Sequence, residues 1–115
     1  MATKQSTVDY ILDQLVSVDD VSTRKMFGEY ALYVNGKVVG LVCDDTLYVK
    51  STEQGKIFSG TYYQEGYAYP GAKVSMVIDE DRIEDREWLS ELVRITADNI
   101  PLAKKKKVSK KSPSR

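Results

Sequence analysis

The sequence lacks histidine altogether and contains only one cysteine, Cys43, among its 115 residues. Histidine is the commonest general base and transition-metal ligand, so His/Cys metal centres and Ser-His-Asp or Cys-His nucleophiles are excluded. Neither a Walker A loop nor a GxGxxG motif occurs. The sequence therefore predicts a protein that is not an enzyme and that uses no cofactor, no metal and no identifiable small-molecule substrate.

Disulfides and long apolar runs are also absent. A lone cysteine cannot form an internal disulfide, and Cys43 lies in an apolar run that predicts a buried strand rather than a reactive thiol. No stretch approaches the roughly 20 apolar residues of a membrane span, and the first residues lack the apolar core of a signal peptide. We therefore expect a cytoplasmic protein that makes no contact with membranes.

The formal net charge is zero, with 17 basic and 17 acidic residues, but the two signs are distributed unevenly. All the acidic residues lie at or before Asp98, which leaves ten basic residues and a net charge of −7 on residues 1–103. The other seven basic residues are Lys104, Lys105, Lys106, Lys107, Lys110, Lys111 and Arg115. We predict a folded acidic domain over residues 1–103 and a disordered basic tail over residues 104–115.

Three helices are predicted from apolar spacing and capping residues. An amphipathic helix is expected over residues 7–17, where Ser6 followed by Asp9 resembles a capping box. A short helix over residues 53–58 can be capped by Ser51 or Thr52 and ended by glycine. A third helix is expected over residues 84–99, after an acidic turn.

Alternating apolar residues predict strands between these helices. A strand pattern starts at Lys25, stops at Asn35-Gly36, a pair typical of a type I′ turn, and resumes after it. Asp44-Asp45 makes the next tight connection, so three strands form a meander with apolar groups on both faces. Two further strands are expected, a short one near residues 67–69 and a clearer one over residues 73–78. The predicted order α-β-β-β-α-β-β-α is an α+β fold, with an antiparallel sheet and helices packed on one face.

The acidic run before the last helix has a structural interpretation. Asp79, Glu80, Asp81, Glu84 and Asp85 lie at a strand end and a helix start, where solvated carboxylates interact favourably with the helix dipole. This interpretation is preferred to a catalytic pair or a cation site.

Two groups of residues are candidate contact surfaces. The first is Tyr62, Tyr63, Tyr67 and Tyr69, which pack structurally or form a protein interface, since tyrosine serves both purposes. The second is the basic tail, whose cations suit the phosphates of nucleic acid but equally suit a solubilising terminus with no dedicated target.

The stretch Arg24-Lys25-Met26-Phe27-Gly28-Glu29-Tyr30 resembles the N-terminal domain of the TfoX/Sxy family of bacterial competence regulators. The resemblance continues through Tyr33, Gly36-Lys37, Leu47-Tyr48-Val49-Lys50 and Lys73-Val74-Ser75-Met76 to Trp88, and it covers about residues 8–100. Within it, we interpret Met26, Phe27 and Gly28 as core and strand-bend residues. Arg24 and Lys25 are interpreted as an exposed cationic patch for nucleic acid.

The resemblance implies an α-β3-α-β2-α fold like that of the dimeric type III secretion chaperones, and a role in regulating natural transformation genes. Full-length regulators of the family carry a second, C-terminal helical domain, and this sequence has its basic tail where that domain would begin. Two hypotheses follow. One is a regulatory domain that acts through protein contacts and weak DNA contacts; the other is a homodimeric adaptor that binds no nucleic acid.

Overall fold

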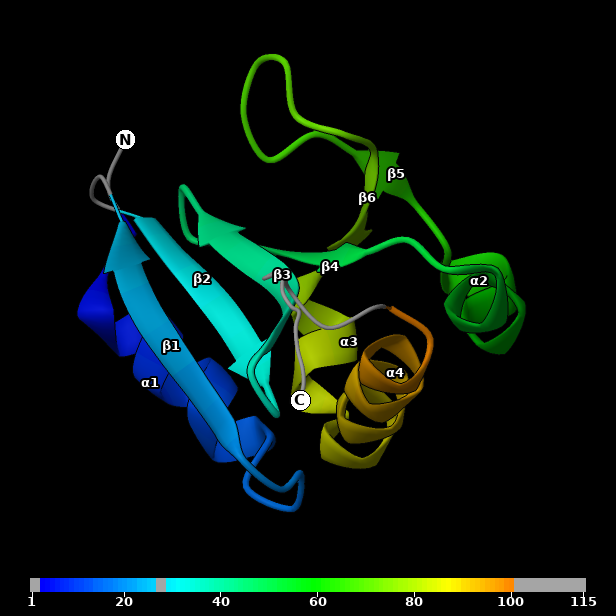
Figure 1. Cartoon of the computed structure of the whole chain (residues 1–115), viewed down its shortest axis with the longest axis horizontal. Coiled ribbons are helices and arrows are strands. Elements are labelled where there is room, and N and C mark those ends of the chain that lie inside the picture. The colour runs from blue at the N-terminus through cyan, green and yellow to red at the C-terminus, as the bar shows by residue number, and fades with distance from the viewer. Residues whose placement is uncertain (1–2, 27–28, 101–115) are drawn as a thin grey trace, which may run out of the picture.

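Six antiparallel strands form one open sheet in the computed structural model, which describes residues 3–26 and 29–100 (Figure 1). The strand order across the sheet is β1-β2-β3-β4-β6-β5. The strands are β1 (Val21–Met26), β2 (Glu29–Val34), β3 (Lys37–Cys43), β4 (Thr46–Lys50), β5 (Glu65–Gly66) and β6 (Ser75–Ile78). The helices are α1 (Gln5–Gln14), α2 (Glu53–Ser59), α3 (Glu80–Glu84) and α4 (Arg86–Asp98), with a 3₁₀ turn over Gly60–Tyr62.

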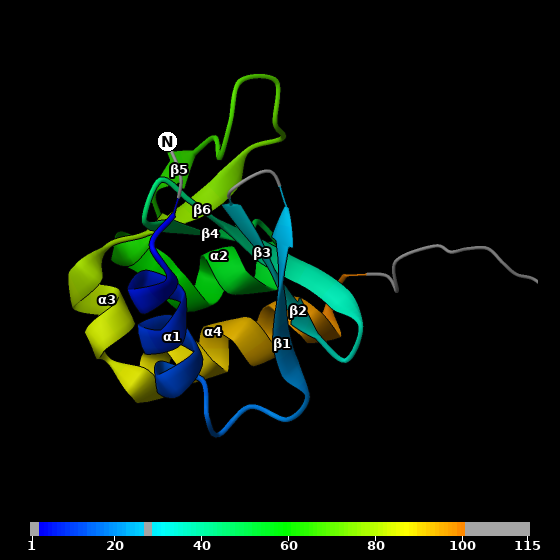
Figure 2. The same cartoon turned by 90° about the vertical axis from the view of Figure 1, so that its left-hand side faces the viewer.

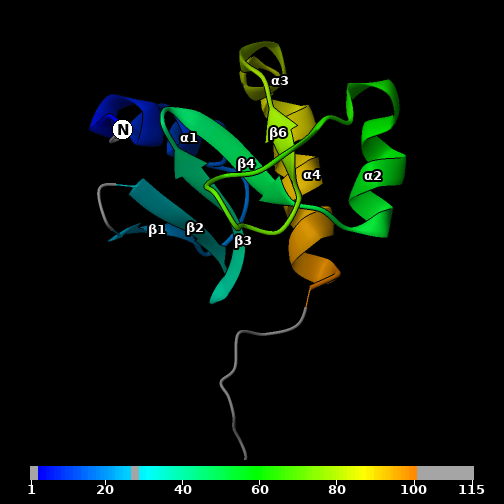
Figure 3. The ribbon, with the colours of Figure 1, turned by 90° about the horizontal axis from the view of Figure 1, so that it is seen from above.

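The helices cover one face of the sheet, as Figures 2 and 3 show for α1 and α4. The core lies between the layers, where Val8 and Ile11 of α1, and Leu15 just after it, meet Leu32 and other inward-facing strand residues. Residues Leu89, Leu92 and Val93 of α4 complete it, all fully buried. The predicted α+β class, with an antiparallel sheet and helices on one side, is confirmed.

The two tight turns of the meander are confirmed in detail. Asn35 and Gly36 have φ values of 53° and 80°, the left-handed pair that a type I′ turn requires. Asp44 and Asp45 repeat this geometry with φ values of 52° and 61°. Aspartate tolerates the left-handed region because its short side chain can hydrogen-bond to nearby backbone groups. The Asp45 side chain, by contrast, hydrogen-bonds to residues that are remote in sequence.

The strand count was wrong by one. The pattern that starts at Lys25 is two strands, because residues 21–26 form β1 and pair in register with β2 from Val21↔Val34 to Met26↔Glu29. Most of β1 is exposed at the sheet edge, so it lacks the apolar alternation that reveals a half-buried strand. The short strand expected near residues 67–69 lies earlier, at Glu65–Gly66, and residues 67–69 are loop.

The first helix is not capped by its own sequence. It begins at Gln5, two residues before the prediction, and the proposed Ser6/Asp9 capping box is wrong. Instead Asp45 of the β3–β4 turn accepts hydrogen bonds at Oδ1 from the Lys4 backbone N–H (2.8 Å) and the Thr7 hydroxyl (2.9 Å). These two bonds lower the pKa of the Asp45 carboxyl. A residue remote in sequence therefore fixes where the helix starts.

We expect Asp45→Asn to lower the urea midpoint at neutral pH, because the charged acceptor that caps α1 is lost. A lowered native pKa stabilises the fold above the ordinary carboxyl value of about 4 and is lost as pH falls through the native value. The deficit should therefore shrink below pH 4. Asp44→Asn is the matched control: it preserves the turn, and the described structure gives the Asp44 carboxylate no hydrogen bond or ion pair. Equal midpoints for the two variants would contradict this role.

The later helices follow the prediction with one addition. Helix α2 is capped by Thr52, whose hydroxyl accepts from the Gly55 N–H at 2.9 Å, as expected. The acidic run is not a turn but the short helix α3, capped by Asp79, and Asp85 caps α4. Helix α3 is short and has a single buried apolar residue, Ile83, so the spacing of apolar residues in the sequence did not reveal it.

Candidate functional site

On the face of the sheet opposite the helices, the described residues form an apolar hollow. A cavity of about 440 Å³ is lined by Met26, Glu29, Tyr30, Leu41, Cys43, Ala68 and Tyr69. A second hollow shares three of these residues with it and extends along Val38, Lys50, Lys73, Val74 and Ile100. We call the two together the open-face groove. Its floor is the sheet, and its wall is the loop of residues 67–74.

Strand register explains why apolar residues line up on this face. Directly paired residues point to the same side of a sheet. The positions Arg24, Ala31, Leu41, Tyr48 and Val77 are paired in turn across five strands. Because Leu41 lines the groove, the whole row lies on the same face of the sheet as the groove. A row that starts with a cation and continues with apolar side chains is a surface suited to recognition rather than a second core.

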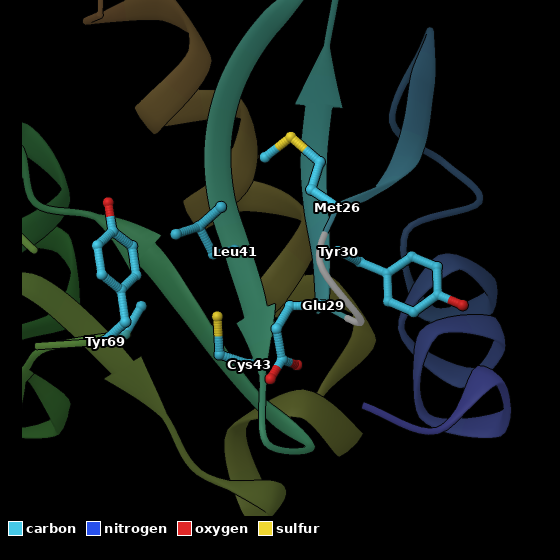
Figure 4. Close-up of a pocket in the computed structure, with 7 residues that line it drawn as sticks. Met26, Glu29, Tyr30, Leu41, Cys43 and Tyr69 are labelled. Atoms are coloured by element: carbon cyan, nitrogen blue, oxygen red, sulfur yellow. The ribbon is translucent and has the colours of Figure 1, made fainter. Parts of the chain in front are cut away.

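Figure 4 shows how the side chains of the smaller cavity lie. Tyr69 approaches from the loop toward Leu41 and Cys43 on β3, while Met26 extends from β1. The ring of Tyr30 points away, and its hydroxyl donates to Gln5 Oε1 on α1 at 2.8 Å. Tyr30 thus borders the cavity, but its ring is directed away from it and belongs to the core.

The two reactive side chains that line the cavity, the Cys43 thiol and the Glu29 carboxylate, both have structural roles. Burial raises the pKa of the Cys43 thiol, and the negative charge of Glu29 raises it further. The thiol therefore stays protonated at neutral pH and is a poor nucleophile, which agrees with the predicted buried strand residue. Glu29 Oε1 accepts from the Thr3 hydroxyl and from the Asp44 backbone N–H, at 3.1 Å in the latter case. Neither group is arranged for acid–base or nucleophilic catalysis.

The open face has an excess of positive charge, whereas the described residues as a whole have an excess of negative charge. The described residues carry ten basic and 17 acidic side chains. On the strand positions and loop residues of the open face, however, three cations (Arg24, Lys50 and Lys73) accompany one carboxylate, Glu29. The acidic residues gather instead at α3 and the start of α4, on the helix side of the sheet (Figure 1).

The predicted cationic patch is divided by the strand it lies on. Arg24 and Lys25 are consecutive residues of β1, so they point to opposite faces. The Arg24 guanidinium lies 5.9 Å from the ring centroid of Tyr33 on the open face. Lys25 pairs with Tyr30 and faces the helix side. The two residues do not form one patch.

The four tyrosines also separate into two groups. Tyr62 packs edge-on against Trp88 with ring centroids 6.0 Å apart, and the Arg82 guanidinium lies 4.0 Å from its ring centroid. The hydroxyl of Tyr63 is hydrogen-bonded to Ser51 at 2.7 Å, and its ring packs on the core. Tyr67 and Tyr69 are 62% and 55% exposed and belong to the groove wall. The first pair is structural, and the second pair is available for contacts.

Three other sequence features are the acidic run, the lack of long apolar segments and the basic tail. Asp79 and Asp85 cap α3 and α4, and among the described residues no group of three His, Cys, Asp or Glu side chains could hold a metal ion. No helix in residues 3–26 and 29–100 is long and apolar enough to cross a membrane. The tail cations Lys104 to Lys107, Lys110, Lys111 and Arg115 lie outside the described residues.

Most groove residues were missed by the sequence reasoning. Leu41, Val38 and Val74 were taken as ordinary strand residues, and Met26 was expected in the core, yet Met26 is 41% exposed. Phe27 and Gly28, given the same interpretation, lie outside the described residues. The signal that could have revealed the groove was the presence of apolar residues on both faces of β3, when helices cover only one.

These observations define an α+β domain with an open, apolar and locally basic sheet face and with no catalytic cluster among its described residues. The TfoX N-terminal domain family matches residues 13–100. An uncharacterized 12.7 kDa protein from the trpE 5′ region of Spirochaeta aurantia is 40% identical over 113 residues, covering 98% of this chain and 96% of that protein. The chain belongs to the TfoX N-terminal domain family.

Protein Sxy of Escherichia coli (strain K12) is a more distant relative. It is 24% identical over 105 residues, which are 90% of this chain but only 50% of Sxy. The chain therefore spans about half the length of Sxy. The family resemblance drawn from residues 24–30 and the later motifs is confirmed.

Two charged residues of the resembling motif have structural tasks. Lys37 Nζ donates to the Ala97 carbonyl at 2.8 Å, which satisfies an acceptor near the C-terminal end of α4 where cations are favoured. Glu29 holds the β3–β4 turn through the Asp44 N–H. Lys37 and Glu29 thus stabilise the fold, whereas Met26 of the same motif lines the groove and Arg24 lies on the same face of the sheet.

Proposed function

We propose that this chain is a non-catalytic regulatory domain that acts by contact with a protein partner at the open-face groove. The observation that carries the proposal is an apolar, locally basic groove on a face that no helix of residues 3–26 and 29–100 covers. Exposed apolar patches of this kind mark interaction sites. The link to competence regulation comes from the family, and it concerns the regulation of natural transformation genes.

The basic tail adds a second, weaker contact in this proposal. Seven cations in the last twelve residues suit the phosphates of nucleic acid without reading base sequence. The acidic body opposes DNA, so the contact is weak and depends steeply on salt. DNA contact therefore tethers the domain, and the groove selects its partner.

We expect a labelled DNA duplex to bind the full chain at 50 mM salt, to bind at least about tenfold more weakly at 200 mM salt, and to be lost when the chain ends at Ala103. Fluorescence anisotropy measures all three affinities. The truncation removes none of the core, which lies between Val8 and Ala97, and circular dichroism verifies its fold. Retained binding by the truncated chain would place a nucleic-acid site on the body and contradict the tail tether.

A homodimeric adaptor without DNA affinity is the second candidate, and one observation favours it. In the described residues β1 pairs only with β2, so along this six-residue strand the backbone groups of alternate residues point outward and are unpaired with another strand. Such an edge accepts a strand from another chain. A dimer mass in light scattering together with no DNA binding would favour the adaptor over the regulatory domain.

A further inference from the structure

We infer that the occupant of the open-face groove is an extended segment of a partner protein in which acidic residues accompany apolar ones. The inference rests on the proposed function and names the chemistry of the partner. Three observations carry it: the exposed apolar lining, the three cations on this face of the sheet, and the presence of only one carboxylate, Glu29, among the described strand and loop positions of the face.

The exposed apolar lining of the groove favours a partner whose own apolar side chains pack against it. Met26, Tyr69 and Val74 are 41%, 55% and 38% exposed, and they border the half-buried Leu41 at the centre. Interface cores are enriched in methionine and tyrosine, and a partner that covers these side chains removes their apolar surface from water. Apolar residues of the partner therefore fit the middle of the groove.

The cations of the open face favour negatively charged residues in the bound segment. Arg24 lies beside Met26 on the open face of β1, and Lys73 lines the far hollow near Val74. Glu29, the one carboxylate among the described strand and loop positions of this face, is outnumbered by three cations, and its Oε1 accepts two structural hydrogen bonds. The described residues as a whole carry a net charge of −7, so among them the open face, with three cations and one carboxylate, favours an acidic segment.

A protein segment suits the groove better than a nucleic acid does. Tight nucleic-acid binding neutralises many phosphates or stacks bases on aromatic platforms. Two cations, Lys50 and Lys73, line the groove, Arg24 lines a neighbouring hollow on the same face, and the apolar Leu41 lies at the centre of the groove. An apolar floor with few charges recognises alternating apolar and acidic side chains.

The test is a selection of random 12-residue peptides displayed on phage against the immobilised full chain. The enriched peptides are then labelled and measured by fluorescence anisotropy. We expect the peptides to be rich in Asp, Glu and large apolar residues. We also expect at least a tenfold loss of affinity for the double variant Arg24→Glu/Lys73→Glu, and little change for Lys25→Glu.

Lys25→Glu is a close control, because it makes the same type of charge reversal on the neighbouring residue of β1 but on the other face of the sheet. All variants keep the basic tail, so its attraction for acidic peptides cancels. A second pair tests the apolar floor: Met26→Ser should weaken binding, whereas Ile57→Ser should not, since Ile57 lies on α2 and is 74% exposed. Circular dichroism verifies that every variant folds.

The outcomes separate the inference from the proposed function. Peptides that depend on Met26 but carry no excess of acidic residues and ignore the Arg24/Lys73 reversal overturn the acidic partner and leave the groove as a protein site. Peptides that ignore Met26, or no enrichment at all, overturn both. If a single-stranded oligonucleotide binds the full chain and loses affinity on the Arg24/Lys73 reversal while no peptide does, the occupant is a nucleic acid and the inference is wrong.

Discussion

Replacing Gly40 by alanine is expected to reduce the free energy of unfolding by at least about 3 kcal/mol, the upper end of what overpacking usually does. Gly40 is buried in β3, and an added Cβ would lie 2.3 Å from the Tyr48 carbonyl oxygen on β4. That oxygen is backbone, so it cannot move without disturbing the β3–β4 pairing on which the groove floor depends. Urea unfolding followed by circular dichroism measures the loss.

Gly66→Ala is the matched control. It also lies in a strand, and its added Cβ would meet Val77 Cγ2 at 2.3 Å, which is a side-chain atom near the sheet edge. A side chain can rotate or shift where a ladder carbonyl cannot, so the loss should be clearly smaller than at Gly40. Equal losses would show that strand glycines are sensitive for a general reason and not because of the Tyr48 contact.

Leu92→Ala is the second large effect, with an expected loss of about 2–5 kcal/mol for a fully buried leucine that leaves a cavity. Leu92 is 0% exposed in α4. Helix α2 comes close to it, since a Cβ added at Gly55 would lie only 3.4 Å from its Cδ1. Loss of the leucine therefore loosens the contact between the two helices as well as the core. Thermal and urea unfolding report the change.

Ile57→Ala supplies the comparison for Leu92. It removes a similar volume from a helix, but Ile57 is 74% exposed, so the change should stay within about 0.5 kcal/mol. A loss of similar size at both positions would contradict the placement of the core between α4 and the sheet.

The turns and the inward faces of the strands could be predicted from the sequence because their physics is local. Asn35-Gly36 and Asp44-Asp45 adopt the left-handed conformations that their side chains tolerate. Tyr30, Leu32 and Val34 alternate as a half-buried strand does. The core face and the meander followed from these signals.

Other features depend on contacts between distant segments and leave no local trace. The start of α1 is decided by Asp45, about 40 residues away, so the local Ser6/Asp9 pair misled. Strand β1 is exposed at an edge, and its pairing with β2 rather than its composition makes it a strand. Helix α3 has only one buried apolar residue.

The candidate site was the least predictable part. Arg24 and Lys25 were expected to form one exposed cationic patch, but consecutive strand residues point to opposite faces, so only Arg24 lies on the open face. Tyr69 was named as an interface residue, while Leu41 and Lys73 join it only through the register of the sheet and the path of the loop over residues 67–74. Sequence spacing does not contain that juxtaposition.

The most direct test of the central claim is a solution NMR titration of the isotope-labelled full chain with a peptide selected on it. The account predicts that amide shift changes concentrate on the open-face groove, at Met26, Leu41, Tyr69 and Lys73 and their neighbours, with α2 and α3 unaffected. Shift changes confined to the helix side or to the tail would contradict the claim that this groove is where the domain meets its partner.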